Sequence, residues 1–300
     1  GNAGTISLDA GATTPTITLG GSLTATGGDR AGTGSAGSGG QIWLKDAVLL
    51  NAAAIAASAQ GGSAGVGAGA NVRFDGTINS TGGARALTVS TNAATIFGGA
   101  VGGTSALASL TTNAGDTTSI GGNVTTTGAQ TYNDAVTLTG GGTRTFASTG
   151  NNVLAFNATV DGASALVANT TGTTSFAGAV GGAPALTSLT TNAGGTTAIN
   201  GGSVRTAGTQ TYDDNVSLGA STTLSTTAIG NITVNGSVAA NGRLLTLAAG
   251  LGNVVMQNAA NDLATVSVTS ATNVALRDTN AIDLGTSTIG ANLTVTSGGA

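Results

Sequence analysis

Residues 99–120, GAVGGTSALASLTTNAGDTTSI, occur again 79 residues later as GAVGGAPALTSLTTNAGGTTAI at 178–199, with seventeen of the twenty-two positions identical. The match continues at Leu87 and Leu166, at Phe97 and Phe176, and, after one inserted residue, at Gln130-Thr131-Tyr132 and Gln210-Thr211-Tyr212. A long internal repeat implies a repeated structural unit. The chain is therefore predicted to carry tandem long repeats at 86–160 and 165–238.

Short runs in which apolar residues alternate with Thr or Ser predict β-strands. The clearest runs are Ile17-Thr18-Leu19, Leu87-Thr88-Val89, Ile232-Thr233-Val234, Val266-Ser267-Val268 and Leu293-Thr294-Val295. In the last third, strands are expected near Val254, Val266, Leu276, Leu284, Ile289 and Val295. Steps of roughly 6–12 residues between them are too short for helices.

The spacing of apolar residues predicts a coil of about 20 residues that carries two or three short strands. Val160 and Val180 are 20 residues apart, Ile78 and Val101 are 23 apart, and Val216 and Val238 are 22 apart. Such stacked coils are typical of a parallel β-helix, or β-solenoid. We predict this all-β fold, as a single continuous segment, for residues 1–300.

Strings of immunoglobulin-like sandwiches are the alternative all-β fold for units of roughly 80 residues. They need a large core, whereas this chain is 3% aromatic and 7% charged and contains 52 glycines. Small Ala, Val, Thr and Ser side chains instead suit a narrow solenoid interior. Disorder is disfavoured because the mean hydropathy is +0.27 and the charge content is low.

The first eighty residues predict coils with long glycine-rich corners. The stretches 27–40 and 59–71 are expected to be mobile loops, and apolar strands follow them at 41–44 and 71–74. Residues 239–300 are expected to form regular coils. Both ends of the chain resemble cuts through a longer solenoid.

Asn and Asp residues near Gly or Ala are predicted to form the turns between strands. Asn92, Asn113 and Asn192 are expected at equivalent corners, and Asp9, Asp75 and Asp161 are expected in turns. Tyr132 and Tyr212 are expected to cover a corner of a coil.

Composition excludes several chemistries. The chain has no Cys and no His, so it lacks a conventional triad, a thiol nucleophile and a transition-metal site. Gly32, Gly34 and Gly37 match G-x-G-x-x-G, but neither a helix nor an acidic residue follows at the required place. Lys45 lacks the glycines of a Walker loop.

The acidic balance of the chain, a net charge of −4 and a pI near 4.4, argues against nucleic acid or an anionic membrane as partner. No apolar run approaches the roughly 18 residues that span a bilayer. We therefore predict no binding of nucleic acid and no membrane insertion.

Paired carboxylates are the remaining route to catalysis, and Asp213-Asp214 is the only adjacent pair, with Asn133-Asp134 as its counterpart. The acids are otherwise dispersed, and no calcium-binding G-G-x-G-x-D repeat occurs. Thr runs at 117–118 and 125–127 lack the strict T-x-T repeat of an ice- or glycan-binding ladder. We predict a chain that is not an enzyme, with no catalytic residue, no cofactor and no metal site.

Three segments resemble the repetitive shafts of filamentous-haemagglutinin-like exoproteins, which are very large bacterial proteins exported by two-partner secretion or related routes. They are GGNVTTTGAQTYNDAVTL at 121–138, GGSVRTAGTQTYDDNVSL at 201–218, and residues 258–300. The resemblance covers most of residues 70–300, and it implies a right-handed parallel β-helix that forms a rod outside the cell.

The resemblance also implies a function as a structural stalk of a secreted or surface-exposed adhesin, active in adhesion and biofilm formation. It implies an outer-membrane secretion pore as the partner during export, and host-cell, glycan or neighbouring-cell surfaces, or further copies of the chain, as later partners. The signatures of the family's secretion domain do not occur in these residues. The alternatives are a self-assembling extracellular filament or matrix protein and a polysaccharide-acting β-helix enzyme.

Overall fold

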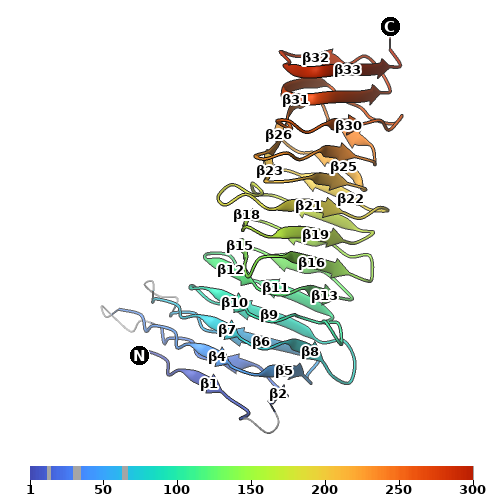
Figure 1. Cartoon of the computed structure of the whole chain (residues 1–300). Helices are drawn as coiled ribbons and strands as arrows, with labels where there is room; N and C mark the ends of the chain where they lie inside the picture. Colours follow the sequence, from blue (N-terminus) through green and yellow to red (C-terminus); the bar gives the residue numbers. More distant parts are fainter. Residues whose placement is uncertain (12–14, 30–34, 63–66, 300) are drawn as a thin grey trace. The chain divides into compact units, whose positions relative to one another are not determined.

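The chain folds as a parallel β-solenoid whose coils are about 22 residues apart, which confirms the predicted fold class. The computed structural model describes residues 1–11, 15–29, 35–62 and 67–299, and these residues contain no helix. Unit 1 comprises Gly1–Thr139 and Arg144–Asn152, and unit 2 comprises Gly140–Thr143 and Val153–Ala300. Each unit is described by itself, and Figure 1 labels the strands of both.

Unit 1 stacks its strands on three faces. The first face consists of β1 (Ile6–Leu8), β4 (Ile42–Leu44), β7 (Val72–Phe74), β10 (Thr95–Phe97), β12 (Thr117–Ile120) and β15 (Ala135–Leu138). The second consists of β2 (Thr16–Leu19), β5 (Ala47–Leu50), β8 (Ile78–Ser80), β13 (Val124–Thr126) and β16 (Thr143–Ser148). The third consists of β3 (Leu23–Thr24), β6 (Ala54–Ser58), β9 (Ala86–Ser90), β11 (Ser109–Thr112) and β14 (Gln130–Tyr132).

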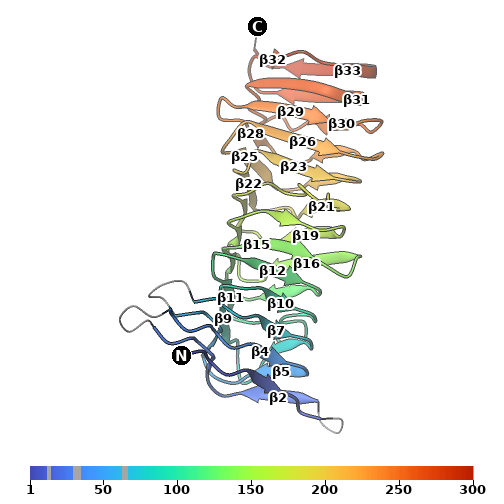
Figure 2. The ribbon, with the colours of Figure 1, turned by 90° about the vertical axis from the view of Figure 1, so that its left-hand side faces the viewer.

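Unit 2 is built in the same way, and Figure 2 shows β22, β25 and β28 lying one above another. One face consists of β17 (Leu154–Phe156), β20 (Thr173–Phe176), β22 (Thr196–Ile199), β25 (Asn215–Leu218) and β28 (Val238–Ala239). Another consists of β19 (Ala165–Asn169), β21 (Ser188–Thr191), β24 (Gln210–Tyr212), β27 (Ile232–Val234), β30 (Val254–Met256), β31 (Thr265–Asp278) and β33 (Ile289–Ser297). The third contains β18 (Val160–Asp161), β23 (Ser203–Thr206), β26 (Thr222–Thr226), β29 (Leu244–Ala248) and β32 (Asp283–Leu284), and β31 also pairs with β29 and β32.

The residue spacings predicted to mark one coil are confirmed as parallel pairs. Ile78 pairs with Val101, Val160 pairs with Val180, and Val216 pairs with Val238. Each coil therefore satisfies its backbone hydrogen bonds on the coils before and after it, as stacked solenoid coils do.

The predicted strands are also confirmed, but two pairs of them are merged near the C-terminus, and one merger places Ile289 and Val295 in the single strand β33. Val266 and Leu276 lie in one 14-residue strand, β31, whose two parts pair with β29 and β30 respectively. A register shift between Leu247 and Ala248 in β29 accompanies this change of partner. Ala271 and Asn273, of the residue types expected between the two strands, lie within β31 where its partner changes.

The interior of each unit is filled by side chains that stack in register. Phe74 and Phe97 stack with their ring centroids 5.5 Å apart in unit 1, and Phe156 and Phe176 stack at 5.4 Å in unit 2. All four rings are fully buried. Aromatic pairs at this distance contribute roughly 0.5–1.5 kcal/mol each beyond their buried area.

Coils near the N-terminus are longer than 22 residues because two glycine-rich hairpins extend from them, formed by the described parts of 25–40 and 59–70. Gly37 and Gly40 donate backbone hydrogen bonds to Gly28 and Ala25, whereas Gly39 donates to a different segment. The amides that donate to the same neighbouring segment are thus three residues apart, whereas in a β-strand such amides are two residues apart. The hairpins have the three-residue period of polyproline II helices.

The second hairpin follows the same rule, since Ala70 donates to Ala59 and Gly67 donates to Gly62. Gly62 in turn donates to Gly37, which joins the two hairpins. Mobile loops were expected here; several backbone groups of the described residues are paired, and the mobility of these segments stays a prediction. Residues 30–34 and 63–66 of the expected loops lie outside the described residues.

Glycine is required in these hairpins because the backbones touch. A Cβ added at Gly62 would overlap the carbonyl oxygen of Gly28 and lie 3.2 Å from the Cβ of Ala36. An added Cβ at Gly20 would meet nothing within 4 Å.

Substitution of Gly62→Ala is therefore expected to separate the two hairpins, while Gly20→Ala is expected to leave them unchanged. Hydrogen exchange of the Gly62 and Gly67 amides should accelerate about tenfold or more in Gly62→Ala, since overpacking costs about 1–3 kcal/mol and 1.4 kcal/mol corresponds to tenfold. Unchanged amide protection in Gly62→Ala would contradict the polyproline II packing.

Candidate functional site

The interior of unit 1 contains a polar pair, Gln130 and Tyr132, among apolar side chains. Both are fully buried in β14. The Tyr132 hydroxyl donates to Gln130 Oε1 at 3.0 Å, and Gln130 Nε2 donates to the carbonyl of Ala147 at 2.9 Å. A further contact joins Gln130 Nε2 to the Thr126 hydroxyl at 3.3 Å. The pair thus links β14 to the backbone on another face of the coil.

Unit 2 repeats this arrangement at Gln210 and Tyr212. The Tyr212 hydroxyl donates to Gln210 Oε1 at 3.0 Å, and Gln210 Nε2 donates to the Ser225 carbonyl at 2.8 Å. Burial raises the pKa of both tyrosines, so the hydroxyls remain protonated donors. The expectation that Tyr132 and Tyr212 cover a corner is wrong, because Gln supplies a buried acceptor that lets the ring point inward.

Asp134, directly after this pair, is a buried acid in unit 1. Its Oδ1 accepts hydrogen bonds from the Thr112 and Thr118 hydroxyls, each at 2.9 Å. Burial raises the pKa of the Asp134 carboxyl, although the two hydroxyls oppose the shift. Thr95, in register with Thr118, has a buried hydroxyl without a hydrogen-bond partner.

Asp214 occupies the corresponding place in unit 2 and is also fully buried. It accepts from the Gly195 amide at 2.7 Å and from the Thr197 hydroxyl at 3.2 Å. Burial raises its pKa, and the hydrogen bond from the Gly195 amide is the largest opposing contribution. The hydroxyls of Thr174 and Thr191 are buried there without a partner.

The adjacent carboxylates Asp213 and Asp214 do not form a catalytic pair in unit 2. Asp214 faces the interior, whereas Asp213 lies on the outer side, where its Oδ1 accepts from Asn235 Nδ2 at 2.6 Å. Two carboxylates that act on one glycoside must face the same cleft. Both residues lie in the corner between β24 and β25, where one carboxylate is buried and its neighbour faces outward.

The residues predicted in turns have mixed outcomes. Asp9 accepts from the Gly11 amide at 3.0 Å, as a turn residue does, whereas Asp161 is the last residue of the strand β18 and accepts from the Ala183 amide, 22 residues later, at 3.2 Å. Asp75 lies between β7 and β8, as predicted for a turn residue, and it also accepts from Trp43 Nε1 at 2.7 Å and from Arg73 Nε.

Asn113 and Asn192 occupy equivalent corners, as predicted. Their Oδ1 atoms accept from the amides of Thr91 and Thr170, one coil earlier, at 2.8 and 2.7 Å. Asn92 is not equivalent to them, because pairing of β9 with β11 aligns Ser90 with the Asn113 position.

Three polar features were missed by sequence reasoning: the Gln130–Tyr132 pair, the buried Asp134 and Asp214, and the surroundings of Trp43. The recurrence of Gln-x-Tyr-x-Asp in both repeats was the available signal for the first two. Of the glycine motif, Gly32 and Gly34 lie outside the described residues, and Gly37 belongs to the first hairpin.

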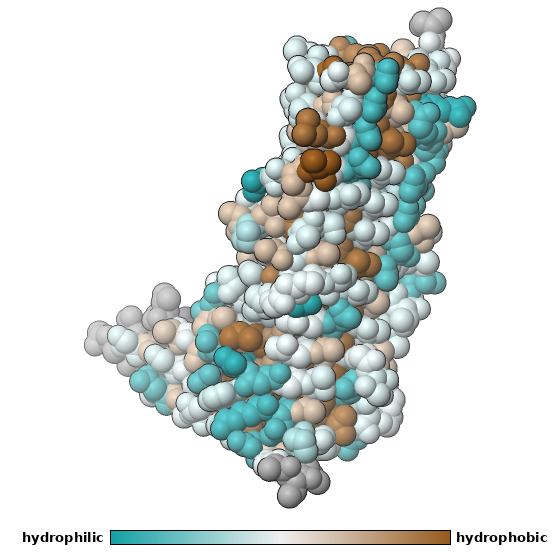
Figure 3. Space-filling model, viewed as in Figure 1, coloured by the Kyte–Doolittle hydropathy of each residue, from teal (hydrophilic) through white to brown (hydrophobic). Residues whose placement is uncertain are grey.

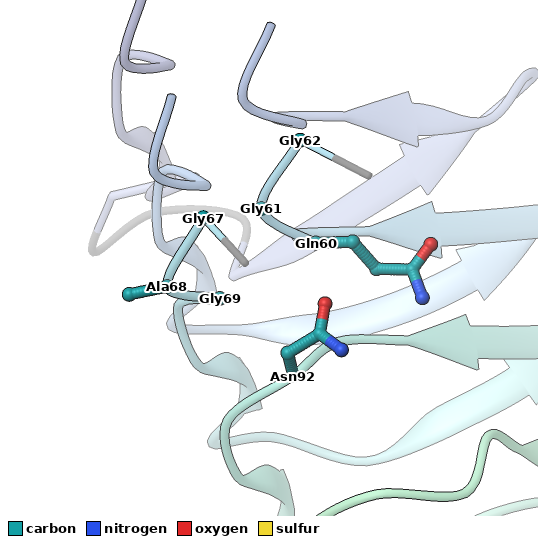
Figure 4. A pocket seen from close by; sticks show the side chains of 7 residues that line it. All are labelled: Gln60, Gly61, Gly62, Gly67, Ala68, Gly69 and Asn92. Atoms are coloured by element: carbon teal, nitrogen blue, oxygen red, sulfur yellow. The ribbon is translucent and has the colours of Figure 1, made fainter. Parts of the chain in front are cut away.

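A hollow of about 370 Å³ lies in unit 1 beside the second glycine hairpin, and Figure 4 shows it. The side chains of Gln60 and Asn92 project beside it, and its remaining described wall is Ala68 and glycine backbone. These lining residues offer amides but no titratable group. The described residues contain no cluster of three or more His, Cys, Asp or Glu that would hold a metal ion.

Comparisons with protein-family models, with curated proteins and with solved structures find no match to this chain. In the described part of the chain, no helix has the length and apolar character needed to cross a membrane.

Removal of the tyrosine hydroxyl tests the interior polar pair. Tyr132→Phe and Tyr212→Phe should each lower the free energy of unfolding by about 1–3 kcal/mol, because each leaves a buried Gln oxygen without its donor. Chemical denaturation measures this loss. A matched Phe156→Leu exchange, which removes no polar atom, controls for ring packing, and equal stability of both Tyr→Phe variants with the parent would refute the assigned hydrogen bonds.

The buried carboxyls of Asp134 and Asp214 predict that the stability of the protein depends on pH. Their native pKa values are raised, so their contribution to stability is complete below the unfolded carboxyl pKa of about 4 and is lost as the pH rises through the native values. In the Asp134→Asn/Asp214→Asn variant, the free energy of unfolding should no longer decline as the pH rises. Chemical denaturation at a series of pH values from acid to neutral measures it. The exposed Asp283→Asn control should retain the decline, and an unchanged decline in the double variant would contradict the assignment.

Proposed function

We propose that this chain is a structural shaft segment of a large secreted or surface-exposed bacterial adhesin, similar to filamentous-haemagglutinin-like exoproteins, that acts in adhesion and biofilm formation. The observation that carries the proposal is the coil-on-coil pairing within each unit, with a filled interior. A shaft must transmit force without a ligand, and this architecture supplies rigidity from backbone hydrogen bonds alone.

The segments that carry the family resemblance support the proposal by their places in the fold. Residues 121–138 contain β13, β14 and β15, and residues 201–218 contain β23, β24 and β25. Each segment includes one buried Gln-x-Tyr pair and one buried Asp. The resemblance therefore rests on residues that build the interior of a coil, as a shaft repeat would.

Export through an outer-membrane pore is part of the proposal. Each coil adds about 4.8 Å along the stack and bonds mainly to its neighbours, so folding propagates coil by coil as a chain emerges. The chain has no Cys, so no disulfide has to form during this process.

The proposal includes no catalytic activity of these residues. Of the buried acids, Asp134 lies in unit 1 and Asp214 and Asp278 lie in unit 2, and each accepts from hydroxyl or amide donors. A polysaccharide-acting enzyme needs a cleft in which two carboxylates flank the substrate.

A self-assembling extracellular filament is the second candidate, and one observation favours it. Ile229 and Leu251 are each 74% exposed and are 22 residues, about one coil, apart in unit 2. Association of this apolar surface with another copy would join chains side by side.

Antibodies against the purified chain test the surface location. Intact, unpermeabilised producing cells should be labelled, and an in-frame deletion of residues 86–238 should reduce biofilm while an intracellular control antigen remains unlabelled. Labelling that appears only after permeabilisation would refute the surface proposal.

Light scattering over a range of protein concentrations distinguishes the two candidates. A shaft segment is expected to remain monomeric, whereas a filament protein is expected to form particles that grow with concentration and to lose this growth in Ile229→Ser/Leu251→Ser. Growth in the parent that the double variant abolishes would favour the filament over the shaft.

A further inference from the structure

Trp43, the only tryptophan of the chain, lies on the outer side of unit 1, where it is half-buried. The Phe and Tyr rings, in contrast, are fully buried in the interiors of the units. Trp43 pairs in register with Ser7 on one side and with Arg73 on the other, within the face formed by β1, β4 and β7. A half-buried indole on the outer side of a strand calls for a physical explanation.

Two cations and two carboxylates surround this indole. The Lys45 Nζ lies 5.0 Å from the ring centroid and the Arg73 Cζ lies 5.6 Å from it, both within cation–π distance. Lys45 pairs with Asp9 at 3.3 Å, and Arg73 pairs with Asp75. We call Asp9, Trp43, Lys45, Arg73 and Asp75 the Trp43 cluster, and Figure 3 shows hydrophilic residues gathered over β1, β4 and β7.

The cluster fixes the guanidinium of Arg73 and the carboxylate of Asp75 beside the indole. The Trp43 Nε1 donates to Asp75 Oδ2 at 2.7 Å, while Arg73 Nε donates to Asp75 Oδ1. Asp75 is thereby held from two sides, yet its side chain is 28% exposed and that of Arg73 is 45% exposed. An aromatic surface beside a fixed guanidinium and carboxylate provides apolar contact together with hydrogen-bond donors and acceptors for hydroxyl groups.

The charges of the cluster favour an uncharged ligand. Its two cations are each paired with a carboxylate, and Asp46 nearby adds a further negative charge, with its Oδ2 accepting from the Ala10 amide at 2.6 Å. Phosphate or sulfate groups would need unpaired cations. The cluster therefore suits neither nucleic acid nor a sulfated chain.

The size of the surface favours a small ligand over a protein. Protein hot spots are surrounded by a larger patch that excludes water. The strongly exposed large apolar side chains among the described residues all lie in unit 2: Val153, Ile229, Leu244, Leu251, Leu284 and Leu293. One indole with a polar border matches the apolar face and hydroxyl rim of a sugar ring.

We propose that the Trp43 cluster is a binding site for neutral oligosaccharides, in which a sugar ring packs against the Trp43 indole and its hydroxyls bond to Arg73 and Asp75. The mobile part is Lys45, because its side chain is 37% exposed and a surface ion pair such as that with Asp9 contributes only about 0–1 kcal/mol. Its displacement opens the indole to the sugar. This inference concerns unit 1 alone and does not rest on the shaft proposal.

The single tryptophan makes the test direct, because its fluorescence reports on this site alone. We would titrate the whole chain with cellohexaose, maltohexaose, mannohexaose and N-acetylchitohexaose, and confirm binding by calorimetry. At least one sugar should change the emission saturably, with a Kd of about 1 mM or tighter. Absence of any change up to about ten times that concentration, or binding of heparin in place of these sugars, would overturn the proposal.

Variants separate recognition from folding. Trp43→Ala should abolish the calorimetric signal, and Arg73→Ala should weaken binding about tenfold, through loss of a charge-assisted donor. Trp43→Phe keeps an aromatic face and should retain weaker binding, which guards against a misfolded Trp43→Ala. Arg205→Ala, an exposed strand arginine of unit 2, should bind as the parent does, and binding that survives Trp43→Ala would overturn the site.

Discussion

The constraint on which the structure depends is the in-register pairing of each coil with the next. Within a unit, a strand has its hydrogen-bond partners one coil away, so the same inward position recurs about every 22 residues. Side chains at that position must stack on one another, as Phe74 does on Phe97. This favours small, β-branched or flat side chains inside, and it explains how a chain with 3% aromatic residues fills its interior.

The largest polar side chains of this interior are bonded in networks, whereas small hydroxyls such as those of Thr95 and Thr174 are buried without a partner. Gln130 and Gln210 reach across the coil to backbone carbonyls, and each also accepts from a tyrosine hydroxyl. A buried amide without these partners would cost several kcal/mol, so Gln and Tyr must occur together. The pair adds a connection between two faces that stacking alone does not provide.

The glycine hairpins of unit 1 solve the same pairing problem with a different period. Extended glycine segments bond to their neighbours every third residue, which allows backbones to approach where a Cβ would collide. Long insertions are thus accommodated beside the coils with backbone groups paired. The Trp43 cluster lies on the regular strands, where the outward positions of adjacent coils bring residues 30 apart in sequence into contact.

The amino-acid sequence by itself determined the fold class, the strands and the coil length, because period-two alternation and the spacing of residues such as Val216 and Val238 are direct consequences of parallel stacking. Its tandem repeat also indicated which corners are equivalent, as at Asn113 and Asn192. Only the tertiary structure decided that Tyr132 points inward, that Asp213 and Asp214 face opposite sides, and that Trp43 meets Arg73 and Asp75. These outcomes depend on which side of a strand a residue occupies and on partners a coil away, and neither can be read from neighbours in sequence.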